Sequence, residues 1–238
     1  MRRNNQYTFE SRVRFSEVNP TRRITLPAII NYFQDCSTFQ SEGFGMGLKY
    51  CEEKKRAWFL SSWQIVVDKY PEMGDKISVN TWATDFRGLF GDRNFCMEDE
   101  NGQILAKANS LWVYMDLAKG RPVKPLPEEI EQYGKGEPLD MEFASRKIDL
   151  PEIIEKKEPI RVMSYHIDTN GHVNNGQYVQ MALEYIDETM PIHQLRVEYK
   201  KSAVYNDVMI PAVAKEEGRT VVVLMDESEK PYVVLEFC

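Results

Sequence analysis

Apolar and polar residues alternate at the start of the chain and then change to a helical spacing. The alternation from Tyr7 to Phe15 predicts a strand, and Asn19-Pro20 predicts a turn after it. Thr25 is placed to cap a helix whose apolar positions recur every three or four residues until Gly43. Four more strands are predicted at 57–67, 76–86, 92–98 and 104–115, and we expect them to form an antiparallel meander.

The same order of patterns returns in the second half. A strand is predicted up to Ile167, and a helix is predicted over 175–188 with Asn174 or Asn175 as its N-cap. The apolar stripe of this helix consists of Tyr178, Met181, Ala182, Tyr185 and Ile186. Strands are predicted at 195–204, 208–215, 220–225 and 232–237.

The two halves align residue by residue at the entry to each helix. Placing Asn19 opposite Asp168 also places Thr25 opposite Asn174, so the caps and the core positions coincide. After the helix, Gly74-Asp75 aligns with Asn206-Asp207 at the same turn between strands. Two copies of one helix with one antiparallel sheet predict a duplicated α+β fold, in which a curved sheet wraps each helix.

The segment 118–159 shows neither the alternation of a strand nor the three-to-four-residue spacing of a helix. It contains six prolines, at positions 122, 125, 127, 138, 151 and 159. It is predicted to be a linker with a short helical piece at 127–133. The expected organisation is therefore a first repeat over 1–117, the linker over 118–159 and a second repeat over 160–238.

A polar segment leads directly into the second helix and carries the candidate chemistry. Asp168, Asn170 and His172 precede the predicted N-cap, where free backbone amides and the helix dipole favour an oxygen that gains negative charge. The opposing interpretation is a turn whose side chains bond their own backbone, which is the usual role of these residue types. The residue types alone favour the turn, and the histidine favours a site.

The pattern Asp-x-Asn-x-His-Val-Asn-Asn-x-x-Tyr, met from Asp168 to Tyr178, resembles the acyl-[acyl carrier protein] thioesterases. With the doubled order of elements, the resemblance covers nearly the whole chain and indicates a bacterial-type member. It implies a double hot-dog fold and hydrolysis of fatty acyl-carrier thioesters in fatty acid biosynthesis. It also implies catalytic roles for Asp168, Asn170 and His172. We expect Asn174, Asn175, Gly176 and Tyr178 to bind the substrate.

One departure from the family bears on the mechanism. Plant members carry a Glu-Cys pair in the strand after this helix, and our alignment places Ser202 and Ala203 there. A mechanism with Asp168 as the base for a water, Asn170 as an orienting group and His172 as the proton donor to the thiol is therefore favoured. Backbone amides near Asn175 and Gly176 would face the carbonyl oxygen. Direct nucleophilic attack by the Asp168 carboxylate stays open.

Three alternatives compete with this hypothesis. The substrate could be an acyl-coenzyme A, or the chain could be a hot-dog module that binds an acyl thioester without turnover. The acid and the histidine at the helix entry favour an enzyme, because binding alone does not need them. His166, Asp168 and His172 could also hold a non-haem iron. We expect no metal and no cofactor, because such oxygenases usually take the second histidine from far downstream.

Composition limits the partners. The net charge of −7 argues against nucleic-acid binding, and no apolar run is long enough to span a membrane. We expect a cytoplasmic enzyme with acyl carrier protein as its partner, and the sequence leaves a homodimer open. Carrier proteins of this kind are acidic, so docking is predicted at local basic clusters. The candidates are Arg22-Arg23, Lys54-Lys55-Arg56 and Lys200-Lys201.

Overall fold

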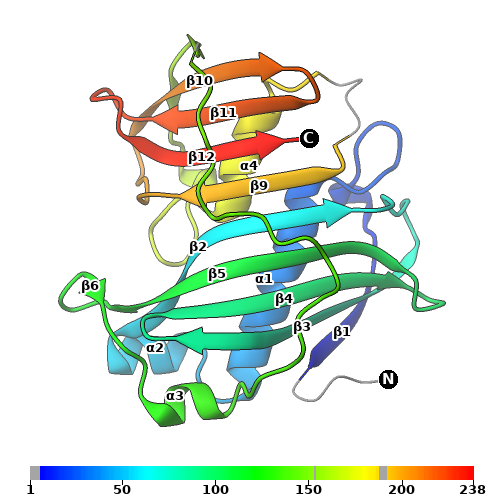
Figure 1. The fold of residues 1–238 in the computed structure, drawn as a ribbon, viewed down its shortest axis with the longest axis vertical. Coiled ribbons are helices and arrows are strands. Elements are labelled where there is room, and N and C mark those ends of the chain that lie inside the picture. Colours follow the sequence, from blue (N-terminus) through cyan, green and yellow to red (C-terminus); the bar gives the residue numbers. More distant parts are fainter. Residues whose placement is uncertain (1–5, 153, 188–191) are drawn as a thin grey trace. The chain divides into compact units, whose positions relative to one another are not determined.

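The computed structural model of the chain describes residues 6–152, 154–187 and 192–238 (Figure 1). Its contacts divide the chain into two compact units, and the division falls within the predicted linker. Unit 1 comprises Met1–Ser61 and Val67–Phe143, and unit 2 comprises Ser62–Val66 and Ala144–Cys238. The segment 118–159 is thus shared between the units, and part of the second strand belongs to unit 2.

The helix of unit 1, α1 (Leu26–Gly43), begins where its cap predicts. The Thr25 side chain accepts a hydrogen bond from the amide of Ala28 at 3.3 Å. The apolar stripe is buried and packs against β1 and β3, which places the core of unit 1 between helix and sheet. The predicted first helix is therefore confirmed.

The strands of unit 1 lie in the order β1-β3-β4-β5-β2. Their bounds are β1 Tyr7–Arg12, β2 Arg56–Val67, β3 Lys76–Arg87, β4 Phe90–Asp99 and β5 Ile104–Asp116, with α2 (Leu48–Lys54) before β2. The antiparallel meander holds for β3, β4 and β5. It is wrong for β2, which lies beside β5, because an alternating pattern specifies which face is buried and not which strand is the neighbour.

Unit 2 repeats this arrangement around α4 (Asn175–Leu183), in the strand order β9-β12-β11-β10-β7. The bounds are β7 Glu155–Lys156, β8 Ile160–Arg161, β9 Gln194–Tyr199, β10 Val208–Glu216, β11 Arg219–Met225 and β12 Pro231–Phe237, and β8 pairs with β10. The predicted strand up to Ile167 is wrong beyond Arg161, because Ser164–His166 form a 3₁₀ turn. The second helix ends at Leu183, earlier than predicted, and Glu188 lies outside the described residues.

Equivalent backbone hydrogen bonds confirm the repeat. In unit 1 the amide of Gly74 donates to Val13 at 2.9 Å, and that of Val13 donates to Asp75 at 3.0 Å. In unit 2 the amide of Asn206 donates to Val162 at 3.0 Å, and that of Val162 donates to Asp207 at 2.9 Å. Gly74 and Asn206 also share a positive φ, of 93° and 72°. The sequence alignment therefore joins structurally equivalent residues.

The first part of the linker covers the sheet of unit 1. It contains β6 (Arg121–Pro122) and α3 (Pro127–Glu131), which confirms the predicted helical piece. Further along, Leu139 packs with the buried Trp82 and Cys96, and the Trp82 indole donates to the carbonyl of Glu137 at 2.8 Å. The segment is thus part of the packed structure of unit 1.

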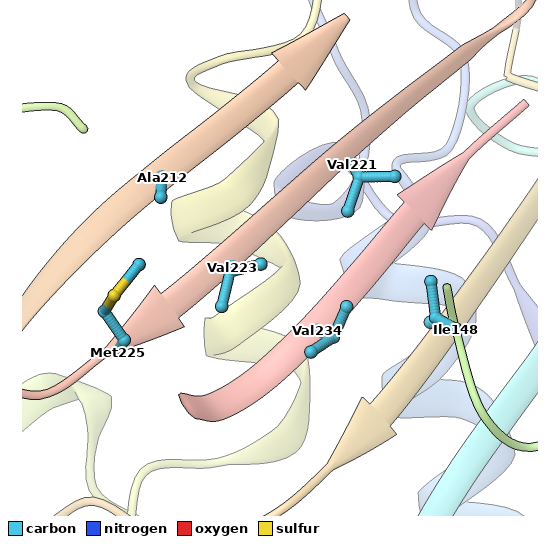
Figure 2. Close-up of a cluster of buried hydrophobic side chains, with 6 residues drawn as sticks. All are labelled: Ile148, Ala212, Val221, Val223, Met225 and Val234. Carbon is cyan, nitrogen blue, oxygen red and sulfur yellow. The ribbon is translucent and has the colours of Figure 1, made fainter. Parts of the chain in front are cut away.

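The second part of the linker covers the sheet of unit 2. Ile148 packs on a buried cluster formed by Ala212, Val221, Val223, Met225 and Val234 (Figure 2). The strands lie between these side chains and α4 in that view. Both faces of this sheet are therefore covered, one by the helix and one by the linker.

Charged side chains of the sheet bind the backbone of this linker segment. Arg196 donates to the carbonyls of Ser145 at 2.6 Å and Lys147 at 2.9 Å, and Arg219 donates to that of Asp149 at 2.9 Å. Both arginines also pair with Glu236, which is only 3% exposed. Backbone recognition thus holds residues 145–149 in place.

No helix in the described part of the chain is long and apolar enough to cross a membrane.

Candidate active site

The loop before α4 is organised around one carboxylate. Asp168 Oδ1 accepts from the amides of Asn170 at 2.8 Å and His172 at 3.4 Å, and the Asp168 amide donates to the His172 carbonyl at 2.8 Å. Gly171, with φ of 76°, donates to the Asp168 carbonyl at 3.0 Å. The structure therefore brings Asp168, Asn170 and His172 together on one tight turn, and the turn interpretation of Asp168 is confirmed for Oδ1.

The remaining groups of the turn are accessible. Asp168 and His172 are half-buried, and Asn170 is exposed. Within the described residues, Asp168 Oδ2 has no hydrogen-bond partner, and neither have the Asn170 amide group and the His172 ring. One oxygen of the carboxylate thus holds the turn, while the other is available to a water or a substrate.

The entry of α4 confirms one prediction and restricts another. Asn174 is the N-cap, and its Oδ1 accepts from the Gly176 amide at 2.8 Å. That amide was expected to face a substrate carbonyl, but in this structure it is engaged in the cap. The amide of Asn174 in turn donates to the His166 carbonyl at 2.9 Å, which ties the helix entry to the preceding 3₁₀ turn. Substrate contacts of Asn174, Asn175 and Gly176 stay predictions.

Tyr178 reaches from α4 to the backbone after β9. Its side chain is 2% exposed, and its hydroxyl oxygen accepts from the Ala203 amide at 2.9 Å. Burial raises the pKa of Tyr178 to about 12, so the phenol keeps its proton at neutral pH. Because the oxygen accepts from Ala203, the hydroxyl hydrogen is directed elsewhere and can be donated. Contact of Tyr178 with a substrate stays a prediction.

The two positions that differ from the plant pattern carry no acid or thiol. Ala203 is 0% exposed, and its carbonyl accepts from the Val173 amide at 2.9 Å, so its backbone supports both the loop and Tyr178. Ser202 is exposed. Neither position can supply the glutamate or the thiol of the plant pattern, and Asp168 and His172 remain the candidate acid–base pair.

His166 has a local role that the sequence did not indicate. It is 7% exposed, and its Nδ1 accepts from the Met163 amide at 2.9 Å. Burial lowers the pKa of His166, which favours the neutral ring. Among the described residues no group of three or more His, Cys, Asp or Glu is arranged to hold a metal ion. The iron alternative thus lacks its ligand set, and the expected absence of a metal stays a prediction.

Tyr199 also contacts the entry of α4, and the sequence analysis did not single it out. Its hydroxyl donates to the Asn175 carbonyl in the first turn of α4 at 3.2 Å, and its ring lies 6.0 Å from that of Tyr178. Only its place on a predicted strand next to the helix could have indicated this contact.

The corresponding loop of unit 1 has the same backbone bonds and different side chains. Asn19 Oδ1 accepts from the amides of Thr21 at 3.1 Å and Arg23 at 3.0 Å, and Arg22 stands at φ of 66° where unit 2 has Gly171. None of these residues can act as a base near neutral pH.

Comparison with known proteins gives a consistent match along the chain. The acyl-ACP thioesterase N-terminal domain model matches residues 4–133, and the C-terminal domain model matches residues 152–231. A chloroplastic palmitoyl-acyl carrier protein thioesterase of Cuphea hookeriana is 28% identical over 220 residues, which covers 83% of this chain and 52% of that protein. The chloroplastic oleoyl-acyl carrier protein thioesterase 1 of Arabidopsis thaliana is 26% identical over 218 residues, which covers 83% of this chain and 60% of that protein. The chain thus spans about half the length of most of these plant relatives.

Solved structures match over almost the full length. An acyl-ACP thioesterase from Bacteroides thetaiotaomicron superposes with a TM-score of 0.89 at 24% identity, covering 98% of this chain and 97% of that chain. The 12:0-ACP thioesterase from Umbellularia californica gives a TM-score of 0.82 at 20% identity, with 98% and 96% covered. These likenesses confirm the predicted α+β tandem hot-dog fold. Together with the two domain models, they lead to the conclusion that this chain belongs to the acyl-ACP thioesterase family.

Proposed function

We propose that the chain hydrolyses fatty acyl thioesters of acyl carrier protein to a free fatty acid and the carrier thiol. The observation that carries this proposal is the turn centred on Asp168. It presents a free carboxylate oxygen and a half-buried histidine at the entry of α4, in a chain of the acyl-ACP thioesterase family.

In the proposed reaction Asp168 Oδ2 takes a proton from a water molecule. The water oxygen attacks the thioester carbonyl carbon, and the resulting oxyanion accepts hydrogen bonds near the N-terminus of α4. The oxyanion then re-forms the carbonyl as the carbon–sulfur bond breaks and His172 gives a proton to the sulfur. Asp168 releases its proton to solvent and His172 takes one up, so that both groups return to their starting states. Each of the general-base and oxyanion contributions is worth roughly 10²-fold or more in rate. The reaction uses only water and side chains, so no cofactor is expected.

The turn itself supports the assignment of the roles. Two backbone amides donate to Oδ1, which fixes the orientation of the carboxylate. Asn170 contributes one of these donors through its backbone, and its exposed side-chain amide can donate to the substrate. His172 lies on the same turn, as a proton donor to the leaving group requires.

We further propose one active site per chain, located in unit 2. The turn in unit 1 has the same architecture, but Asn19, Thr21 and Arg23 supply no base. The first repeat is proposed to shape the acyl-binding region. A cytoplasmic location and a homodimer stay predictions from the sequence.

The decisive experiment is a hydrolysis panel with the purified chain. Saturated acyl groups of increasing length are presented on acyl carrier protein and on coenzyme A, and released thiol is measured. We expect turnover that favours the carrier protein. A preference for coenzyme A would move the chain to the acyl-CoA alternative, and binding without turnover on either carrier would identify a non-catalytic module.

A further inference from the structure

The three basic clusters predicted from the sequence differ in how their charges are compensated. Lys200 pairs with Glu198 at 2.6 Å, Lys201 pairs with Asp226, and Arg56 pairs with the buried Glu129 at 3.4 Å. These three cations are paired within the chain, whereas Lys54 and Lys55 are exposed and have no carboxylate partner among the described residues. The Arg22-Arg23 cluster differs in that neither of its members has a carboxylate partner in the described part of the chain, and both are exposed.

The two arginines stand on the turn of unit 1 that corresponds to the catalytic turn. Asn19 Oδ1 and the Asn19 backbone hold this turn through the amides of Thr21, Arg22 and Arg23. Arg22 occupies a left-handed position, with φ of 66°, where the other copy has a glycine. Such a position crowds a residue that has a Cβ. Local backbone geometry would favour glycine, so it gives no reason for an arginine here.

Exposed apolar side chains flank the arginines. Phe15 is 84% exposed, and Met73 is 42% exposed. The amide of Met73 donates to the Arg22 carbonyl at 2.9 Å, and Arg23 forms a bridge with Glu72. The Gly74 amide binds Val13, which brings the segment containing Met73 next to the segment containing Phe15. We call Phe15, Arg22, Arg23 and Met73 the arginine patch.

We propose that the arginine patch is the docking surface for an acidic acyl carrier protein. This inference rests on the proposed function and goes beyond it, because it selects one of three clusters and adds two apolar anchors. In a chain with a net charge of −7, a local pair of uncompensated guanidinium groups favours the attraction of an acidic partner. Arginine, phenylalanine and methionine are also among the residue types enriched at protein interfaces.

The test compares carrier-bound and carrier-free substrates. The variant Arg22→Glu/Arg23→Glu is assayed against Arg121→Glu/Lys215→Glu, which makes the same change in net charge at exposed basic residues without ion pairs in the described structure. Arg22→Gly serves as a second variant that suits the left-handed position. The readouts are the Kd for holo carrier protein, and kcat/KM for acyl carrier protein and for the uncharged N-acetylcysteamine thioester of the same acyl group.

We expect the arginine reversal to weaken carrier binding and lower kcat/KM on acyl carrier protein by at least about 10-fold, with the N-acetylcysteamine substrate unaffected. Phe15→Ala should weaken binding in the same direction. Equal effects of the two double variants, or none from either, would overturn the patch assignment. If the wild-type chain hydrolyses neither substrate, the proposed function fails. The direct Kd measurement then still decides whether the patch binds the carrier.

Discussion

Replacing Asp168 by asparagine should separate its chemical role from its structural one. The Asp168 carboxylate accepts two amides of the turn through Oδ1, so alanine would remove both bonds together with the charge. Asparagine keeps an oxygen at the same place. Unit 1 already has asparagine at the equivalent position, and Asn19 holds that turn with its own Oδ1.

The expected magnitudes follow from these contacts. Each hydrogen bond of the turn contributes about 1 kcal/mol, so Asp168→Ala should lower the free energy of unfolding by about 1–2 kcal/mol. For a chain of 238 residues that corresponds to a fall in Tm of about 2–4 °C. Asp168→Asn should stay within about 0.5 kcal/mol of the wild type. It should nevertheless lose at least about 10²-fold in kcat, or about 2.7 kcal/mol of barrier, because an amide cannot accept the proton of the water.

The assay pairs denaturant or thermal unfolding with kcat on the best substrate of the hydrolysis panel. Asn19→Ala is the matched control, since it removes the equivalent bonds from the other copy. It should lower stability about as much as Asp168→Ala and change substrate affinity or chain-length preference more than kcat. Full turnover by Asp168→Asn would refute the base assignment, and equal destabilisation by asparagine and alanine would refute the account of the turn.

Three further outcomes are expected. His172→Gln should reduce kcat on alkyl thioesters by at least about 10²-fold, and much less on aryl thioesters, whose thiolate leaves without a proton; equal losses on both would contradict its role as the acid. Glu129→Gln should cost about 2 kcal/mol of unfolding free energy, because this buried carboxylate accepts from Tyr50 at 3.0 Å and Tyr114 at 2.7 Å. The exposed neighbour Glu128→Gln is its control in the same denaturation experiment. Hydrolysis should survive chelating agents, and a full loss that one divalent metal restores would revive the iron alternative.

The features that depend on neighbouring residues could be predicted from the sequence. Thr25 and Asn174 were recognisable as caps, because a short polar side chain before an apolar stripe satisfies free amides within its own turn. The turn centred on Asp168 was recognisable for the same reason. Since both copies keep these local signals, their alignment also identified equivalent positions such as Gly74 and Asn206.

The features that depend on distant partners could not be predicted. The place of β2 beside β5 depends on a strand pairing that its own alternation does not encode. The pairing of Lys201 with Asp226 and of Arg56 with Glu129 likewise joins residues that are far apart in the sequence. A basic cluster in the sequence therefore overstates the charge that is available to a partner.

The cover that residues 144–149 place over β9–β12 determines where the chain can be divided. The sequence pattern predicts that the second repeat begins at residue 160. A fragment that starts there would lack Ile148 and leave Val221, Val223 and Met225 facing water. Such a surface favours aggregation over soluble expression. Arg196 and Arg219 would also lose the carbonyls of residues 145, 147 and 149. Because those arginines contact the backbone, we expect substitutions of the side chains at these three positions to cost less stability than a chain break there.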